Sequence, residues 1–380
     1  MKEREDIFMS SRIDFLYLNE EDMIKAGVMD MAKCVDEMAE VYNLMGQGDY
    51  LMGGGNGNSH GQPIFFPDEP KHPGMPKNGP DRRFMTMEAY LGGKYHICGE
   101  KWYGSNRENV PKGLPRSILM VMLNDVDTGA PIALMSGNMI SNMRTGAIPG
   151  VGARYLARKD SKVCGLVGAG VITRISLMSL MITVPTLETI KIYDIFPASS
   201  ERLAAFIREN YPQVKNIELV DSLEAAVRDS DVVHIATSGK DDPVVQGEWI
   251  KKGAFFSLPA NFRLEHGFIA ENCKNVVDNW LTYEAWAEEL TYPYSASVGL
   301  LGCTLMDMLH DNEITMDKIT NLGDIIAGNK PGRTNDDEII LFGQGGLPTY
   351  DVAWAWHCLN NARELGIGQT LNLWEKPAGI

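Results

Sequence analysis

The stretch CGLVGAGVITRISLM, from Cys164 to Met178, constrains the fold more than any other part of the sequence. An apolar run ends in the glycines Gly165, Gly168 and Gly170, and a pattern typical of a helix follows at once. A glycine turn between a strand and a helix lets the backbone approach a pyrophosphate, which then lies at the helix N-terminus. The stretch therefore predicts the strand, turn and helix of a dinucleotide-binding α/β fold.

Short strand-like and helix-like segments alternate from residue 161 to about residue 279. Strand-like segments such as TIKIYDI and DVVHIATS alternate with helix-like segments such as SERLAAFIREN. Successive strand–helix units of this kind predict a parallel sheet with helices on both faces.

The residues before this region follow other patterns. Residues 14–48 show helical periodicity, whereas residues 53–83 are dense in Gly, Pro and Asn and predict a long loop, either a surface loop or a binding loop. The segment NDVDTGAP, at 124–131, has the composition of a hairpin turn between two β-like runs. We therefore expect an antiparallel sheet here and helices again after residue 296.

Composition excludes several classes of protein. The net charge is −15 and no basic block is present, which argues against a nucleic-acid partner or an anionic membrane surface. No apolar run approaches the roughly 18–20 residues that span a bilayer, and the charged start lacks a signal-peptide core, so we expect a cytoplasmic protein. The six cysteines are scattered without a CxxC pair, and we expect no metal site.

The residue that ends the second strand of the alternating region bears on the cofactor. Asp194 follows Gly170 by about two dozen residues, and a carboxylate there accepts hydrogen bonds from the ribose hydroxyls and repels a 2′-phosphate. This favours NAD over NADP, although Arg202 lies not far along the chain. Thr173 replaces the third glycine of the fingerprint, a position that serves packing. The expected cofactor-binding residues are Gly168, Ala169, Gly170, Val171, Ile172, Asp194, Thr237 and Ser238.

Three separated segments resemble one known family. MRTGAIPGVGARYLARKDSKVCGLVGAGV, starting at Met143, is similar to a signature of the ornithine cyclodeaminase/μ-crystallin family. IIAGNKPGRTNDDEIILFGQGGLPTYDVAWAW (325–356) resembles a late segment of that family, and CGEKWYGSN with GLPRSILMVMLNDVDTGAPIALM (98–135) resembles its early core. Together they cover most of residues 85–370.

The resemblance implies two structural parts. One is a Rossmann-type NAD-binding domain, expected at 151–300. The other is a discontinuous α+β domain that forms the homodimer and much of the substrate pocket, expected at 1–150 with C-terminal helices at 301–380 returning to it.

The resemblance also implies site residues. Arg144 matches the family arginine that binds the substrate carboxylate, and a planar guanidinium suits that role. Lys101 matches the lysine that reaches the same carboxylate or the α-nitrogen, and it could relay a proton. Thr145 is expected to shape the wall beside the cofactor. Asp351 matches a late family aspartate of structural or catalytic role, and His234 is expected to be a core histidine.

Two departures from the family pattern concern the substrate. Ornithine cyclodeaminases and the family's alanine dehydrogenases carry an aspartate that activates or holds the substrate amine. The corresponding stretch FFSLPANFRLEHGF (255–268) has none. Asn261 or Glu265 could stand in its place, although an asparagine cannot act as a general base. An early family arginine also lacks a clear counterpart, and Arg82 or Arg83 could supply the charge.

These residues predict NAD-dependent hydride transfer at the α-carbon of a small amino or imino acid. The expected outcome is imine formation followed by deamination, cyclisation or net oxidation, as in ornithine cyclodeaminase. The alternatives are an imine or ketimine reductase, and a non-catalytic protein that binds a nucleotide and a ligand, as μ-crystallin does.

Overall fold

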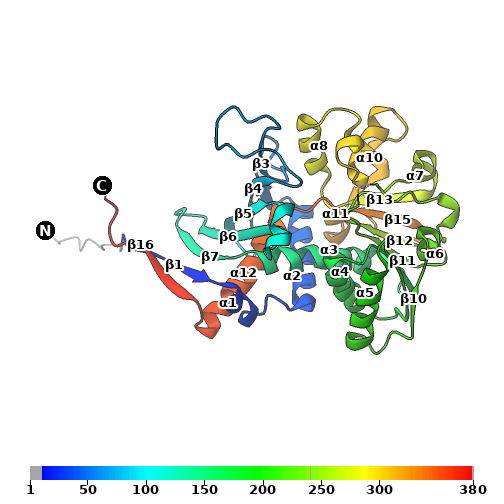
Figure 1. The fold of residues 1–380 in the computed structure, drawn as a ribbon, viewed down its shortest axis with the longest axis horizontal. Helices are drawn as coiled ribbons and strands as arrows, with labels where there is room; N and C mark the ends of the chain where they lie inside the picture. Colours follow the sequence, from blue (N-terminus) through cyan, green and yellow to red (C-terminus); the bar gives the residue numbers. More distant parts are fainter. Residues whose placement is uncertain (1–10, 240, 379–380) are drawn as a thin grey trace.

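The computed structural model describes residues 11–239 and 241–378. Within these residues the chain forms two sheets, which lie at opposite sides of the molecule with helices between them (Figure 1). The two sheets match the two parts expected from the sequence, and the α/β fold class is confirmed.

The first sheet has the strand order β16-β1-β7-β6-β5-β4-β2, and β3 pairs with β4. Its neighbours are antiparallel except for β1 and β7, which are parallel. The strands are β1 (Ile13–Leu18), β2 (Tyr50–Met52), β3 (Gln62–Phe65), β4 (Arg83–Leu91), β5 (Ile97–Ser105), β6 (Ser117–Asp125), β7 (Pro131–Ser136) and β16 (Gln369–Trp374). The expected hairpin turn joins β6 to β7, where the Asp125 N–H donates to the Ala130 carbonyl at 2.9 Å.

The expectation of a continuous helical region at 14–48 is wrong at its start. Residues 13–18 form β1, and the helices α1 (Glu20–Lys25) and α2 (Met31–Gln47) follow. β1 is a strand because it pairs with β7 on one side and with β16, more than 350 residues later, on the other. Such distant partners leave no mark on local periodicity.

The second sheet is parallel throughout, in the order β10-β9-β8-β11-β12-β15-β13-β14. Its strands are β8 (Val163–Val167), β9 (Thr189–Tyr193), β10 (Asn216–Leu219), β11 (Val232–Ile235), β12 (Phe255–Leu258), β13 (Cys273–Val277), β14 (Ile319–Asn321) and β15 (Ile339–Gly343). The C-terminal region, for which only helices were expected, thus contributes β14 and β15 to this sheet and β16 to the first. β15 enters between β12 and β13.

Helices cover both faces of the parallel sheet and fill the space between the sheets (Figure 1). α3 (Asn138–Leu156) packs along α4 (Val171–Thr183), and α12 (Pro348–Leu365) returns to pack on β4, β5 and α2. The other helices are α5 (Pro197–Asn210), α6 (Leu223–Val227), α7 (His266–Asn272), α8 (Trp280–Glu289), α9 (Tyr294–Ser297), α10 (Leu301–His310), α11 (Leu322–Ile326) and the short 3₁₀ helices η1 (Arg107–Lys112), η2 (Gly247–Trp249) and η3 (Met316–Lys318).

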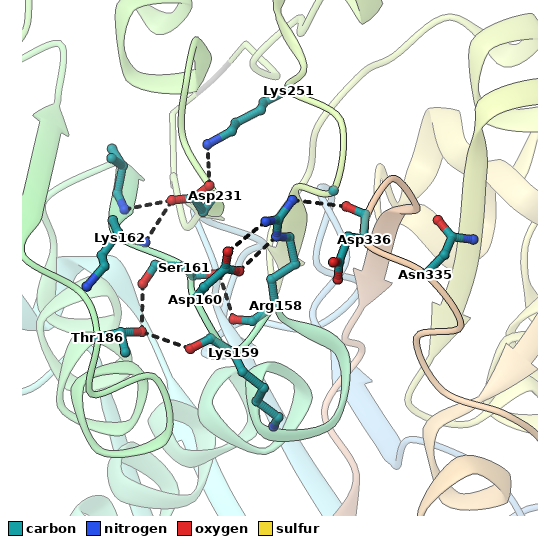
Figure 2. A network of polar contacts seen from close by, with 12 residues as sticks. Arg158, Lys159, Asp160, Ser161, Lys162, Thr186, Asp231, Lys251, Asn335 and Asp336 are labelled. Carbon is teal, nitrogen blue, oxygen red and sulfur yellow. Dashed lines mark hydrogen bonds and ion pairs between the residues drawn. The ribbon is translucent and has the colours of Figure 1, made fainter.

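An ionic network joins the amino ends of the parallel strands (Figure 2). Asp231, just before β11, accepts the N–H groups of Lys162 and Val163 at the start of β8, at 2.7 and 3.0 Å, and it pairs with Lys251. Arg158 pairs with Asp160 at 2.7 Å. Because ligands of such sheets bind at the carboxyl ends of the strands, this network serves the fold.

None of the helices in the described ranges is long and apolar enough to cross a membrane.

Candidate functional site

A cavity of about 920 Å³ opens at the carboxyl ends of the parallel strands and reaches the first sheet. Its wall combines residues that the sequence pattern assigned separately to the cofactor and to the substrate. The expected residues on this wall are Lys101, Arg144, Thr145, Gly170, Val171, Ile172, Thr237 and Ser238. One cavity therefore brings together residues expected at the cofactor and at the substrate. Gly168, Ala169 and Asp194, which were also expected to bind the cofactor, are not among its lining residues.

The glycine turn has the geometry that its composition predicts. Gly168 follows β8 with a φ of +86°, in the left-handed region that favours glycine. A Cβ at this position would lie 2.5 Å from the Ala236 carbonyl oxygen, so a side chain would also clash with the loop after β11. At Gly170 a Cβ would meet no atom within 4 Å, because this residue faces the cavity.

The N-terminus of α4 is open to the same cavity. Gly170 is its N-cap and offers no side chain to the first N–H groups, and Val171 and Ile172 line the cavity. Free N–H groups at a helix N-terminus stabilise an anion such as a pyrophosphate. Thr173, which replaces the third glycine, is fully buried and serves packing.

Asp194 lies directly beside the glycine turn. Its Oδ2 accepts the Ala169 N–H at 2.7 Å, and its Oδ1 accepts the Phe196 N–H at 2.8 Å. The next two side chains, Ile195 and Phe196, are 68% and 66% exposed and offer an apolar surface to a nucleobase. The open helix end, the uncrowded Gly170 and this carboxylate fit the phosphates and ribose of a dinucleotide.

Lys101, Arg144 and Asp351 form a buried group that we call the inner cluster. Lys101 Nζ lies 2.8 Å from Asp351 Oδ2, and Arg144 reaches the same carboxylate through Nε and Nη2, each at 3.1 Å. β5, α3 and α12 bring these residues together, and all three are at most 6% exposed. Two cations against one carboxylate leave one positive charge, which favours an anionic ligand.

The inner cluster directs free donors toward the cavity. Arg144 uses Nε and Nη2 on Asp351, while Nη1 lies beside Gly346, where an added Cβ would be 3.2 Å away. Burial and the nearby Arg144 charge lower the pKa of Lys101 to about 8, against the opposing effect of Asp351. Lys101 can therefore hold or release a proton near neutral pH.

His60 is a wall residue that the sequence analysis missed. It comes from the loop at 53–83, and its Nδ1 lies 2.6 Å from the Gly346 carbonyl oxygen. Since a carbonyl can only accept, Nδ1 carries the hydrogen and Nε2 keeps its lone pair. Burial lowers the pKa of His60 to about 4, so the ring is neutral near pH 7 and accepts hydrogen bonds through Nε2.

The structure also locates the residues about which the sequence left alternatives. Neither Asn261 nor Glu265 lines the cavity, and Asn261 donates to Asp242 at 3.1 Å. Arg83 lines the cavity, whereas Arg82 donates to the Lys77 carbonyl at 3.0 Å. His234 is fully buried within β11, as expected for a core histidine.

Other wall residues that the sequence analysis did not single out include Tyr103, Arg107 and Arg116. Arg107 begins η1, and Arg116 directly precedes β6, so both lie in the connection from β5 to β6. Arg107 directly follows the matched segment CGEKWYGSN, and Arg116 lies within the matched segment that begins GLPRSILM, so motif context was the available signal.

The family model described as "Ornithine cyclodeaminase/mu-crystallin family" matches residues 28–366. This match includes the whole parallel sheet, all of the first sheet except β1 and β16, and every residue of the inner cluster. The chain belongs to this family. The family expected from the three sequence segments is thereby confirmed.

Three relatives cover almost the whole chain. The N-((2S)-2-amino-2-carboxyethyl)-L-glutamate dehydrogenase of Staphylococcus aureus is 29% identical over 95% of this chain and 99% of its own. The structure of Thermococcus litoralis Delta(1)-pyrroline-2-carboxylate reductase with NADH and L-proline is 29% identical, with a TM-score of 0.75 over 93% of this chain and 99% of its own. An archaeal alanine dehydrogenase dimer with bound NAD is 25% identical, with a TM-score of 0.76 over 95% and 100%.

These relatives are dehydrogenases and reductases of amino and imino acids. The two solved structures contain NADH or NAD, the cofactor expected from the sequence. The family thus includes enzymes that catalyse the class of reaction predicted from the sequence.

Proposed function

We propose that this protein is an NAD-dependent enzyme that transfers hydride at the α-carbon of an amino or imino acid. One observation carries the proposal: a single cavity joins an open helix N-terminus after a glycine turn to a buried cluster with one net positive charge. A bound NAD supplies the hydride acceptor or donor. Gly168, Gly170 and Asp194 would hold it, with Thr237 and Ser238 in the loop beside the glycine turn.

The inner cluster would fix the substrate. Arg144 would donate from Nη1 to the substrate carboxylate, and the Lys101 ammonium would complete its neutralisation. Asp351 would act as a positioning residue, because its carboxylate holds both cations in place. Because the cations are buried, their attraction for a carboxylate is stronger than at a surface. Thr145 would complete the wall next to the carboxylate.

Proton transfer would involve Lys101 and His60. With a pKa near 8, Lys101 can deliver or take a proton at the substrate nitrogen. The His60 Nε2 would accept a hydrogen bond from that nitrogen. Hydride and proton would leave the α-carbon and the α-nitrogen together in oxidation, and they would return in reduction.

Net oxidation or reduction fits this cavity better than cyclisation of a diamino acid. Cyclisation needs a base that frees a second amine for attack. No Asp or Glu side chain lines the described cavity wall, and the candidates Asn261 and Glu265 lie elsewhere. We therefore propose a dehydrogenase or reductase and treat cyclodeaminase activity as the alternative.

The test is to incubate the protein with NAD and a panel of L-amino acids that includes alanine, proline, glutamate, ornithine and lysine. NADH absorbance and released ammonia are read in the same wells, and NADH oxidation is followed with cyclic imines and with 2-oxo acids plus ammonia. NADH formation or consumption supports the proposal. Ammonia without NADH would support the cyclodeaminase, and binding without any turnover would support the μ-crystallin type.

We further propose that the protein works as a cytoplasmic homodimer. The face of the first sheet that looks away from α12 exposes large apolar side chains at Phe84, Trp102, Ile118 and Met120, each 40–50% exposed. A contiguous apolar surface of this kind is typical of a subunit interface. The archaeal relative is described as a dimer.

The cysteines in the described residues are free, which suits a reducing compartment.

A further inference from the structure

The cavity wall is cationic although the protein is acidic. The chain has 50 Asp and Glu against 35 Lys and Arg. Within the described residues, the wall nevertheless carries no carboxylate side chain and five cations, namely Arg83, Lys101, Arg107, Arg116 and Arg144. A cleft lined by one sign of charge concentrates ligands of the opposite sign. The inner cluster accounts for only two of these cations.

Two of the other three arginines pair with a carboxylate of their own, and the third, Arg107, lines the same cavity. Asp81 pairs with Arg83, and it pairs with Arg116 at 2.8 Å. Asp81 also accepts the Ser105 hydroxyl at 2.6 Å. We call Arg83, Arg107, Arg116 and Asp81 the outer cluster. Asp81 fixes two of the arginines in place, and Arg107 joins them from η1.

The charge balance of the two clusters differs. In the inner cluster, Asp351 leaves one of two positive charges without a partner, and one substrate carboxylate neutralises it. The outer cluster holds three guanidinium groups and one carboxylate, which pairs with two of them, so two positive charges remain. A substrate with a single carboxylate would satisfy only the inner cluster.

Tyr103 connects the two clusters. Lys101 Nζ lies 5.7 Å from the centre of its ring, and the Arg83 guanidinium carbon lies 5.8 Å from the same centre. The Tyr103 hydroxyl is 3.4 Å from Arg83 Nη2. Both cations therefore flank one ring within one cavity, and a single extended ligand with an acidic group at each end can reach both clusters.

We propose that the outer cluster binds a second carboxylate, and that the substrate is an amino or imino acid with at least two carboxylates. This inference rests on the proposed function, since it assigns the other end of the same substrate. Guanidinium groups suit this role because they bind carboxylates through paired hydrogen bonds. The α-carboxylate occupies the inner cluster, and the distal carboxylate meets Arg107 and Arg116.

The test compares acids with their amides of equal shape. L-glutamate, L-glutamine, L-aspartate and L-asparagine are titrated calorimetrically into the full-length protein, with and without saturating NADH. We expect each acid to bind about tenfold more tightly than its amide, the gain of one good charge-assisted contact. Equal affinity of acid and amide, or no binding of either, would overturn the inference.

Two substitutions assign the preference to the outer cluster. R107Q and R116Q are expected to bring the ratio of acid to amide affinity close to one, while amide and NADH affinities stay unchanged. R116K should retain part of the preference. R82Q is the matched control, because it removes the same charge from a neighbouring loop, at a residue that does not line the cavity. A parallel loss of NADH affinity in R116Q would assign these arginines to the cofactor phosphates and overturn the inference.

Turnover separates this inference from the proposed function. Hydride transfer only with monocarboxylic amino acids would leave the proposed function intact and overturn the second carboxylate site. A preference for acids in binding without hydride transfer to any substrate would support the site and contradict the proposed function.

Discussion

Asp351 holds two cations of the candidate site from a fully buried position on α12. Its place in the first turn of that helix also suits a negative charge. The excess of one positive charge in the inner cluster is what makes the site a receptor for a carboxylate. Substrate binding and proton transfer at this site therefore depend on single charges and single protons.

Asp351→Asn should destabilise the fold, because it leaves Lys101 and Arg144 buried without their counter-charge. We expect the free energy of unfolding to fall by about 3 kcal/mol in urea at pH 7. Asp36→Asn is the control: Asp36 pairs with Arg154 but is 58% exposed in its side chain, and we expect less than about 1 kcal/mol. Equal losses in both variants would contradict the importance of the inner cluster.

The pKa of Lys101 predicts an alkaline limit to activity. With a pKa of about 8, Lys101 loses its proton as the pH rises through 8, and the attraction for the substrate carboxylate falls with it. We expect kcat/KM for imine reduction, which needs the protonated lysine, to fall about tenfold per pH unit above this value. In Lys101→Arg the charge persists, so the limit should move to higher pH. An unchanged limit in that variant would assign it to another group.

Motif context singled out the inner cluster and, apart from the alternative of Arg82 or Arg83, not the outer cluster. Lys101, Arg144 and the glycine turn occur in segments with a recognisable pattern. His60, Arg107 and Arg116 lie in loops, and their approach to the cavity depends on how those loops fold back. His60 reaches it through the carbonyl of Gly346, a residue 286 positions away. Such contacts have no local signal in the sequence.

At the scale of elements, the turn from β8 to α4 contains two glycines with different roles. Gly168 needs its positive φ and the space beside Ala236, whereas Gly170 has ordinary backbone angles and faces the cavity. One glycine therefore serves the fold, and the other serves the ligand.

Alanine at each glycine separates these two roles. Gly168→Ala should lower the free energy of unfolding by about 2 kcal/mol, from the left-handed backbone and the clash with Ala236. Gly170→Ala should leave stability nearly unchanged but weaken NADH binding about tenfold, because its methyl group enters the space for the pyrophosphate. Thermal unfolding and NADH fluorescence titration measure both effects. Similar stability losses in the two variants would contradict this division.

Elements with local partners were predicted well, and those with distant partners were not. The strand–helix units from 161 to 279 pair largely with neighbours in the chain, so their periodicity shows the fold. β1 pairs with β16, and β15 inserts between β12 and β13 after a long excursion. Residues 13–18 therefore gave no sign of a strand, and the C-terminal region was expected to be helical only.

For the whole molecule, the first sheet has one face covered by α12 and another that exposes apolar side chains. Phe84 and Trp102 stack on this second face, with ring centres 5.9 Å apart. The inner cluster lies on the covered side of the same strands. Assembly through the exposed face would therefore support the walls of the cavity without blocking it.

Trp102→Asp should dissociate the proposed dimer, since a carboxylate in the centre of an apolar interface would be desolvated. Light scattering after size-exclusion chromatography should give a mass near the 42.1 kDa of one chain for this variant and twice that for the native protein. Leu219→Asp, at a 47% exposed position on the edge strand β10, is the control and should stay dimeric. A monomeric native protein would contradict the proposal.

Hydride transfer to the α-carbon is the central claim, and isotope transfer tests it most directly. NADH carrying deuterium at the transferring position of C4 would be incubated with the protein and a panel of imines from mono- and dicarboxylic amino acids. We expect an amino-acid product with one deuterium at its α-carbon, detected by mass spectrometry. The Arg144→Ala variant should not form this product. A product without deuterium, or no product from any imine in the panel, would contradict the central claim.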